Sequence, residues 1–268
     1  MIKVGVMGAR GRMGNEILRL SLEDEGIDVV AVWEAKGHPD LGKSIRELGI
    51  GEKDLVIDVF PSNLPEVDVV IDFTLPSATR EVVAEVERLR KKAVIGTTGL
   101  SEEDKEMIKK AAEKIAIVFS PNMSLGVNLL FVLTQLTVSV LPDEYEIEII
   151  EAHHHHKKDA PSGTAMRIWE ILKAGRGLSD SDVVFGRKGI TGPRRKEEVG
   201  IHAIRCADIV GEHTVMFGVD GERIELVHKA SSRRAFARGA ILAAKFLKQE
   251  SQGLYDMLDV MGLRAIFG

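Results

Sequence analysis

The sequence predicts a doubly wound, parallel α/β sheet followed by an α+β domain with a mixed or antiparallel sheet. Two observations predict the first part: strands and helices alternate over residues 1–124, and glycine-rich or polar segments follow the strands. One observation predicts the second part, because strands with few helices dominate residues 125–238. We expect the tail, residues 239–268, to pack back on the first domain.

Six apolar runs in the first part predict buried parallel strands. They are Ile2–Met7, Ile27–Trp33, Leu55–Phe60, Val67–Phe73, Ala93–Ile95 and Ile115–Phe119. Helices are expected after Gly14, over Ser77–Lys91 and after Ser101, where Ser101 and Asp104 have the spacing of a capping box. The pattern is weakest over residues 35–66.

Open parallel sheets bind their ligands beyond the carboxyl ends of the strands. The unusual loops of this chain fall there, namely Gly8–Gly14, Glu34, Thr74–Ser77, Gly96–Gly99 and Ser120–Ser124. Glycine lets the backbone approach a pyrophosphate, and Glu34 is placed where an acid accepts from ribose hydroxyls. The spacing G-x-x-G-x-x-G is a weak signal by itself, and these glycines alternatively only shape tight turns. The whole set favours a dinucleotide site.

The second part begins with Leu125–Leu141, the longest apolar run, which polar residues interrupt and which is short for a bilayer span. It predicts a buried helix. Strands are expected at Tyr145–Glu151, Val183–Phe185, Ile201–Arg205, Glu212–Gly218 and Arg223–His228. A long helix is expected over Ser231–Gln249.

The most unusual segment is Glu151–Thr164, which contains four consecutive histidines and two lysines. It lies between an expected strand and a helix that begins near Pro161–Thr164. Backbone N–H groups at a helix N-terminus attract anions, and histidine donates protons near neutral pH. The segment therefore predicts a cationic, proton-donating pocket for a small carboxylate or phosphate substrate.

Three alternatives compete with that interpretation. The first is a solvated charge run. The second is a metal site of a metal-dependent hydrolase, although adjacent strand residues point to opposite faces and at most two of the histidines face one centre. The third is another nicotinamide oxidoreductase, such as a semialdehyde dehydrogenase with Cys206 as nucleophile. No base adjoins Cys206 in the sequence, which favours an inert strand cysteine.

Composition narrows the function class further. The net charge is −5 with 29% charged residues, so the charge balance gives no indication of a basic surface that would bind nucleic acid. The single Cys206 excludes an internal disulfide and fits a reducing compartment. Met1–Lys3 leads directly into an apolar strand without a visible signal peptide. We therefore expect a cytoplasmic protein with no metal, no nucleic-acid partner and no membrane contact.

The segment Glu151–Ala165 closely resembles the substrate motif of the 4-hydroxy-tetrahydrodipicolinate reductases, formerly called dihydrodipicolinate reductases, of the diaminopimelate route to lysine. The resemblance covers essentially the whole chain, including residues 4–14, 96–99, 120–128, 208–217 and 228–233. It implies a Rossmann-like dinucleotide-binding domain over 1–124 and a substrate-binding, tetramerising domain over 125–238. It also implies NADH or NADPH as cofactor and a cyclic dicarboxylic imine as substrate.

The resemblance assigns His153 as proton donor and Lys157 as its catalytic partner, with His154, Gly163 and Thr164 holding the substrate. It assigns cofactor binding to Gly8, Ala9, Arg10, Gly11, Arg12, Met13, Glu34, Gly96, Thr97, Thr98, Ser120, Pro121, Asn122 and Met123. His155 and His156 are expected to pack or orient.

One departure from the family pattern concerns the nucleotide. Well-known members have arginine directly after the acid that ends the second strand, whereas Ala35 and then Lys36 follow Glu34 here. Arginine in that position stacks on adenine and pairs with a 2′-phosphate. We therefore expect both nucleotides to work, with NADH at least as good.

Overall fold

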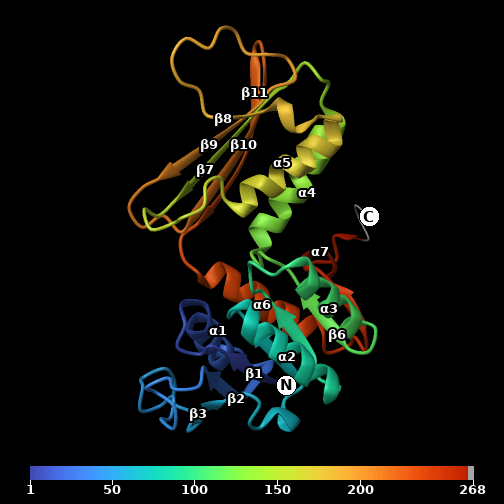
Figure 1. Ribbon diagram of the computed structural model, residues 1–268. Coiled ribbons are helices and arrows are strands. Elements are labelled where there is room, and N and C mark those ends of the chain that lie inside the picture. Colours follow the sequence, from blue (N-terminus) through green and yellow to red (C-terminus); the bar gives the residue numbers. More distant parts are fainter. Residues whose placement is uncertain (265–268) are drawn as a thin grey trace. The chain divides into compact units, whose positions relative to one another are not determined.

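The computed structural model describes residues 1–264, which form two compact units (Figure 1). One unit contains Met1–Leu125 together with the chain from Arg233 onward, and the other contains Gly126–Ser232. The sequence placed the second crossing near residue 238. It lies earlier in the structure because the whole of helix α6 (Arg234–Phe246) belongs to the first unit.

The first unit is built on a seven-stranded sheet in the order β3-β2-β1-β4-β5-β6-β12. All its strand pairs are parallel. The strands are β1 (Ile2–Met7), β2 (Ile27–Glu34), β3 (Ile57–Val59), β4 (Val69–Asp72), β5 (Lys92–Ile95), β6 (Ala116–Phe119) and β12 (Gly253–Tyr255). The order reverses direction at β1 and β4, which is the switch point of a doubly wound sheet. The predicted Rossmann-like fold is confirmed for this unit.

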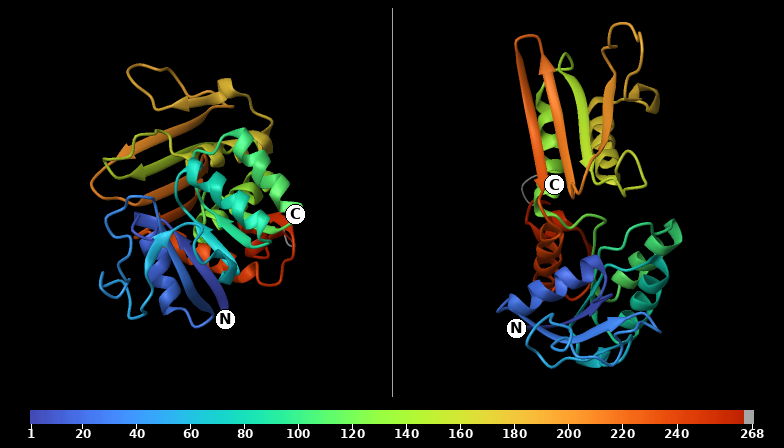
Figure 2. Two further views of the ribbon diagram at one scale, coloured as in Figure 1. Left: turned by 60° about the horizontal axis from the view of Figure 1, so that its bottom comes forward. Right: turned by 90° about the vertical axis from the view of Figure 1, so that its left-hand side faces the viewer.

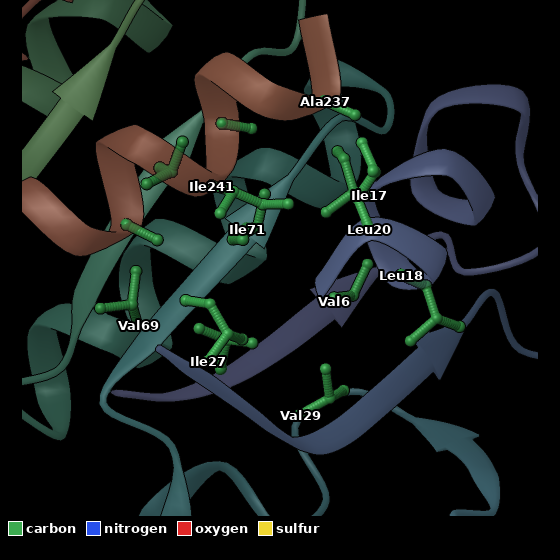
Figure 3. Packing of buried hydrophobic residues seen from close by; sticks show 14 of the residues in the cluster. Val6, Ile17, Leu18, Leu20, Ile27, Val29, Val69, Ile71, Ala237 and Ile241 are labelled. Carbon is green, nitrogen blue, oxygen red and sulfur yellow. The ribbon is translucent and has the colours of Figure 1, made fainter. Parts of the chain in front are cut away.

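Helices cover both faces of this sheet. They are α1 (Arg12–Glu23), α2 (Pro76–Arg88), α3 (Glu102–Ala112), α6 and α7 (Met257–Val260), with a short 3-10 turn at Leu64–Glu66. Figure 3 shows Ile17 and Leu20 of α1 and Ala237 and Ile241 of α6 packed against the sheet residue Ile71. Side chains of α2 and α3 form a second apolar cluster, on the other face. Burial on both faces explains why the strands are continuous apolar runs.

The second unit contains a five-stranded mixed sheet in the order β11-β10-β7-β9-β8. The strands are β7 (Glu146–His153), β8 (Val183–Phe185), β9 (Val199–Arg205), β10 (Gly211–Val219) and β11 (Glu222–Ala230). Strands β7, β9 and β8 pair in parallel, whereas β10 is antiparallel to both β7 and β11. Helices α4 (Leu125–Val140) and α5 (Gly163–Arg176) lie on one face of this sheet, as Figure 1 and the right-hand view of Figure 2 show. A 3-10 turn, Asp180–Asp182, precedes β8.

Three details differ from the expectations. Strand β7 continues to His153, two residues beyond its predicted end at Glu151. Helix α4 is only partly buried within the chain, because Leu129, Leu136 and Val140 are exposed. Strand β12 and helix α7 carried no recognisable sequence signal, since each is only three or four residues long.

Candidate functional site

The sequence-predicted residues fall into two groups, one in each unit. The first group lies on the loops that follow β1, β2, β4, β5 and β6, which we call the carboxyl edge. At its centre the glycine loop turns back on itself, with the Gly11 N–H donating to the Gly8 carbonyl at 2.8 Å. Gly8 has a positive φ of 61°, and a β-carbon on Gly14 would lie 1.9 Å from the Gly8 carbonyl oxygen. Both positions therefore require glycine for the turn itself.

The N-terminus of helix α1 is suited to an anion. Its N-cap is Gly11, which provides no side-chain acceptor for the N–H groups of the first turn. Those groups and the helix dipole favour a bound negative charge. Arg12 is exposed in the first turn, whereas Ala9 and Met13 pack in or against the apolar core. Of the predicted loop residues, Ala9 and Met13 can thus contact a ligand mainly through their backbone N–H and C=O groups.

Glu34 ends strand β2 beside the glycine loop. Its carboxylate accepts from the Arg10 N–H at 2.6 Å and from the Ala35 N–H at 3.0 Å. The Arg10 side chain turns away to Asp40, with Nε 2.8 Å from the carboxylate, and Lys43 pairs with the same Asp40. These two partners hold the pKa of the Asp40 carboxyl below its ordinary value, Lys43 contributing the largest effect. Arg10 is therefore already paired with an acid in this structure.

A buried acid that sequence reasoning missed organises the next two loops. Asp72 ends strand β4 and has no exposed surface. Burial raises the pKa of its carboxyl, although the hydroxyl groups of Thr74 and Thr79 donate to it at 2.5 Å each. Thr97 also contacts the carboxyl and accepts from the Thr74 N–H at 3.1 Å. Thr97 thus ties the loop after β5 to the loop after β4. An acid at the end of an otherwise apolar strand was the signal available for Asp72.

The remaining predicted residues of the carboxyl edge divide by exposure. Thr98 and Pro121 are exposed, whereas the Met123 side chain lies in the apolar core. Gly96 has a packing role, because a β-carbon there would lie 2.2 Å from the Phe73 ring. Ser120 donates to the Asn122 carbonyl at 2.8 Å and so shapes the loop after β6.

The second group surrounds Glu151 at the end of strand β7. Residues two apart on a strand face the same side, and the extension of β7 therefore places His153 beside Glu151. The Nδ1 atom of His153 lies 2.6 Å from the Glu151 carboxylate. Arg205, from β9, donates to both oxygens of the same carboxylate at 2.8 Å, and the Ser162 N–H donates at 2.9 Å. Together with His213 these four residues form what we call the Glu151 cluster.

The Glu151 carboxylate has no exposed surface. Burial alone would raise its pKa, but the hydrogen bonds from His153 and Arg205 outweigh burial and lower the pKa to about 2. The group is therefore ionised at neutral pH and can only accept hydrogen bonds. Nδ1 of His153 must then carry a hydrogen, and Nε2 is the nitrogen left to react. Nε2 faces Gly211, where an added β-carbon would lie 3.1 Å away.

His213 and Ser162 complete the cluster. Ser162 caps helix α5 by accepting from the Ala165 N–H at 3.2 Å, and its hydroxyl lies 3.1 Å from Nε2 of His213. The His213 ring meets the His153 ring edge to face, with centroids 5.2 Å apart. Burial, assisted by the neighbouring His153, lowers the pKa of His213 to about 3, so His213 is neutral. Neither Arg205 nor His213 carried a role in the sequence prediction.

The predicted anion-binding residues adjoin the cluster. Lys157 pairs with Asp159 at 2.9 Å, and its side chain is mostly covered. Gly163 and Thr164 occupy the first two positions of helix α5, as predicted, with Ser162 as N-cap. A β-carbon on Gly163 would meet no atom within 4 Å, so the space beside this helix start is open. The residues that the sequence predicted to bind an anion thus lie at a helix N-terminus next to His153.

The other histidines are more exposed. The rings of His155 and His156 are 3.9 Å apart, and the His155 N–H donates to Ala207 at 3.2 Å. His154 is half-buried and lies near His156, with ring centroids 6.2 Å apart. Within residues 1–264, no group of three or more His, Cys, Asp or Glu side chains is placed to hold a metal ion. Cys206 is exposed and follows strand β9 directly, so it is not in the strand where the sequence placed it.

Comparison with known families matches both units of the chain. The family model described as "Dihydrodipicolinate reductase, N-terminus" matches residues 2–123, and the one described as "Dihydrodipicolinate reductase, C-terminus" matches residues 126–261. Two curated relatives are named 4-hydroxy-tetrahydrodipicolinate reductase. The protein from Methanocaldococcus jannaschii is 47% identical over 274 residues, with 99% of each chain covered. The protein from Hahella chejuensis is 45% identical and covers 98% of this chain and all of its own.

Solved structures add two comparisons. A dipicolinate-bound dihydrodipicolinate reductase from Paenisporosarcina sp. TG-14 superposes with a TM-score of 0.77 at 26% identity, covering 97% of this chain and 98% of that one. An aspartate semialdehyde dehydrogenase from Vibrio cholerae superposes with a TM-score of 0.58 at 12% identity, covering 93% of this chain and 99% of that one. The second likeness concerns the fold alone. No helix within residues 1–264 has the length and apolar character needed to cross a bilayer.

Proposed function

The chain belongs to the dihydrodipicolinate reductase family, and on that premise we propose that it reduces 4-hydroxy-tetrahydrodipicolinate to tetrahydrodipicolinate, with loss of water, in the diaminopimelate route to lysine. The observation that carries this proposal is the Glu151 cluster beside the start of helix α5. It combines two features. The first is a histidine, His153, whose Nδ1 is hydrogen-bonded to Glu151, and the second is a set of backbone N–H groups that suit a carboxylate. A cyclic dicarboxylic imine needs both features, because it must be held by its carboxylates and receive a proton.

We assign the proton transfer to His153. After hydride addition, the Nε2–H bond of the His153 imidazolium breaks and its proton goes to the adjacent substrate carbon. Nδ1 keeps its own hydrogen, which stays hydrogen-bonded to Glu151. Lys157 pairs with the substrate, exchanging the exposed Asp159 for a carboxylate of the ligand. The N–H groups of Gly163 and Thr164 hold the other carboxylate, and His154 lines the same place.

The reductant of the family is a reduced nicotinamide dinucleotide, which supplies hydride when bound. The carboxyl edge fits such a group in two respects. The start of α1 has no side-chain cap and follows a loop whose turn requires glycine at Gly8 and Gly14, which suits a pyrophosphate site. Glu34 stands at the end of the second strand, where it accepts from ribose hydroxyls. The residues proposed to hold the nucleotide are the fourteen that the resemblance assigned.

We propose that NADH serves at least as well as NADPH. An acid at Glu34 repels a 2′-phosphate, and Ala35 leaves the chain without the arginine that offsets this repulsion. The pairing of Arg10 with Asp40 supports the proposal, because that guanidinium must leave an acid before it can meet a phosphate. Lys36 is exposed and remains available to NADPH.

Two further expectations accompany the activity. We propose that the protein works in the cytoplasm as a homotetramer, and the exposed apolar side chains of helix α4 supply surface for subunit contacts. Multi-angle light scattering of the purified protein tests the tetramer. A monomer at micromolar concentration would contradict it.

The test of the function is oxidation of NADH and NADPH with freshly generated 4-hydroxy-tetrahydrodipicolinate, followed by loss of nicotinamide absorbance. We expect turnover with both nucleotides, undiminished by a metal chelator. Aspartate semialdehyde with phosphate and the oxidised nucleotide, followed by gain of nicotinamide absorbance, serves as the control, because it tests the Cys206 alternative. Turnover of the control but not of the imine precursor would replace the proposal.

A further inference from the structure

The Glu151 carboxylate is saturated by three different parts of the second unit. It binds the His153 imidazole, the Arg205 guanidinium in bidentate fashion, and the Ser162 N–H at the start of helix α5. An ionised carboxylate without exposed surface is costly unless an opposite charge and hydrogen bonds compensate it. The cluster thus maintains a buried charge in contact with the proposed proton donor.

We propose that Glu151 and Arg205 are a pair of positioning residues for His153: the carboxylate fixes its tautomer and the start of helix α5, and the guanidinium neutralises the carboxylate. The inference rests on the proposed function and deepens it. Neither residue needs to touch the substrate for this role. Both act through His153 and through the Ser162 backbone.

The Glu151 carboxylate determines which tautomer the neutral His153 ring adopts. Because the Glu151 oxygens can only accept, the neutral imidazole keeps its hydrogen on Nδ1, at 2.6 Å from the carboxylate. The imidazolium carries a second hydrogen on Nε2, which passes to the substrate and leaves this neutral Nδ1–H form. Nε2 then takes another proton from solvent, and the Nδ1–H bond is unchanged through the cycle. A glutamine in place of Glu151 presents an amide that can also donate, so it no longer enforces one tautomer.

The charges of the two residues act on His153 in opposite directions. An anion beside Nδ1 stabilises the imidazolium and makes His153 a weaker acid, whereas the Arg205 cation counteracts that anion. With both present, the charges of the local pair nearly cancel. Removing the Glu151 charge should therefore shift the pH profile of turnover to lower pH, and removing the Arg205 charge should shift it to higher pH.

The other ionisable groups around His153 are the same in all the variants below. They are His213 on β10, His228 opposite it on β11, and Lys157 and Asp159 on the loop between β7 and α5. Burial lowers the pKa of His228, and it lowers the pKa of His213 to about 3, so His213 does not compete for a proton at neutral pH. Lys157 and Asp159 form an ion pair with each other.

The experiment compares Glu151→Gln, Arg205→Met and the double variant with the wild type, by the pH profile of kcat/KM. Activity falls at high pH when His153 loses its proton. We expect this limb to move to lower pH in Glu151→Gln and to higher pH in Arg205→Met, each by about 1 pH unit. In the double variant the two displacements should largely cancel. Arg205→Lys keeps the charge and should keep the wild-type limb, which serves as the control if Arg205→Met does not fold.

A second measurement reads the tautomer without turnover. Long-range ¹H–¹⁵N spectra of the histidine rings, with His153→Gln to identify its signals, should show Nδ1 protonated in neutral His153 of the wild type. In Glu151→Gln we expect the Nε2–H form to appear. Limbs that move in the same direction in both single variants, or an Nε2–H tautomer in the wild type, would overturn the inference. A wild type that does not reduce the imine precursor at any pH would instead contradict the proposed function.

Discussion

The glycine loop of the first unit offers a ligand mainly backbone groups, whereas the end of strand β7 in the second unit offers buried side chains. In the glycine loop, sterics require glycine at positions 8 and 14, and the helix α1 that follows has no side-chain cap at its N-terminus. The ionised carboxylate of the Glu151 cluster joins β7, β9 and the start of α5, and β10 joins the cluster through the hydrogen bond between His213 and the Ser162 hydroxyl. Backbone N–H groups are available at almost any residue, but a buried acid needs particular partners.

This difference teaches how each region should respond to change. A backbone site depends on the shape of the loop, so it is sensitive to added volume and tolerant of changes in charge. A buried ionic cluster depends on matched charges, so removing one partner leaves the other uncompensated. The predictions below test this contrast from the largest expected effect to the smallest.

His153→Gln should lower turnover roughly 10²–10⁴-fold, since a positioned acid contributes about that factor. The dissociation constant of NADH, measured by titration calorimetry, should change little because His153 belongs to the second unit and the proposed nucleotide residues to the first. His155→Gln alters an exposed neighbour and is the matched control. Near-wild-type turnover in His153→Gln would remove this residue from the mechanism.

Gly14→Ala should weaken NADH binding by roughly 5–140-fold, because overpacking against the Gly8 carbonyl costs roughly 1–3 kcal/mol. Binding of pyridine-2,6-dicarboxylate alone should be unaffected. Gly11→Ala is the graded control, since its β-carbon would lie 3.1 Å from the same oxygen rather than 1.9 Å. Equal NADH affinity in Gly14→Ala and the wild type would show that the shape of this loop does not govern the site.

Lys157→Ala should weaken binding of pyridine-2,6-dicarboxylate by roughly 10–100-fold, the range expected for a hydrogen bond to a charged group. Gly163→Val should have a similar effect without loss of stability, because its side chain would enter open space beside the helix start. Lys158→Ala, at an exposed neighbouring lysine, is the control. Unchanged affinity in both Lys157→Ala and Gly163→Val would place the anion elsewhere.

Ala35→Arg should shift the ratio of NADPH to NADH efficiency several-fold toward NADPH, and Glu34→Ala should erode discrimination mainly by weakening NADH. Asp40→Asn should produce a smaller shift toward NADPH of a few-fold, because it releases the Arg10 guanidinium from its ion pair. Calorimetry with 2′,5′-ADP and 5′-AMP measures the phosphate contribution directly. A wild type that strongly prefers NADPH would contradict the nucleotide argument.

The sequence by itself determined the parallel sheet of the first unit, a mixed or antiparallel sheet in the second and the position of the helix that starts at Gly163. These features are local: apolar runs, turn residues and caps act within a few residues, as the Ser101–Asp104 capping box shows. The motif from Glu151 to Thr164 also identified the family, since its residue types are specific. Roles within that motif could be named only where the resemblance named them.

Tertiary structure decided the partners of those residues. Arg205 lies 54 positions from Glu151, and His213 lies 51 positions from Ser162, and no periodicity states which distant side chain meets a buried acid. Asp72 likewise acquires its role from Thr97, 25 positions away. The extension of β7 to His153 depends on its pairing with β9, where His153 is opposite Arg205. Strand pairing and burial set these contacts, and both arise only when the whole chain has folded.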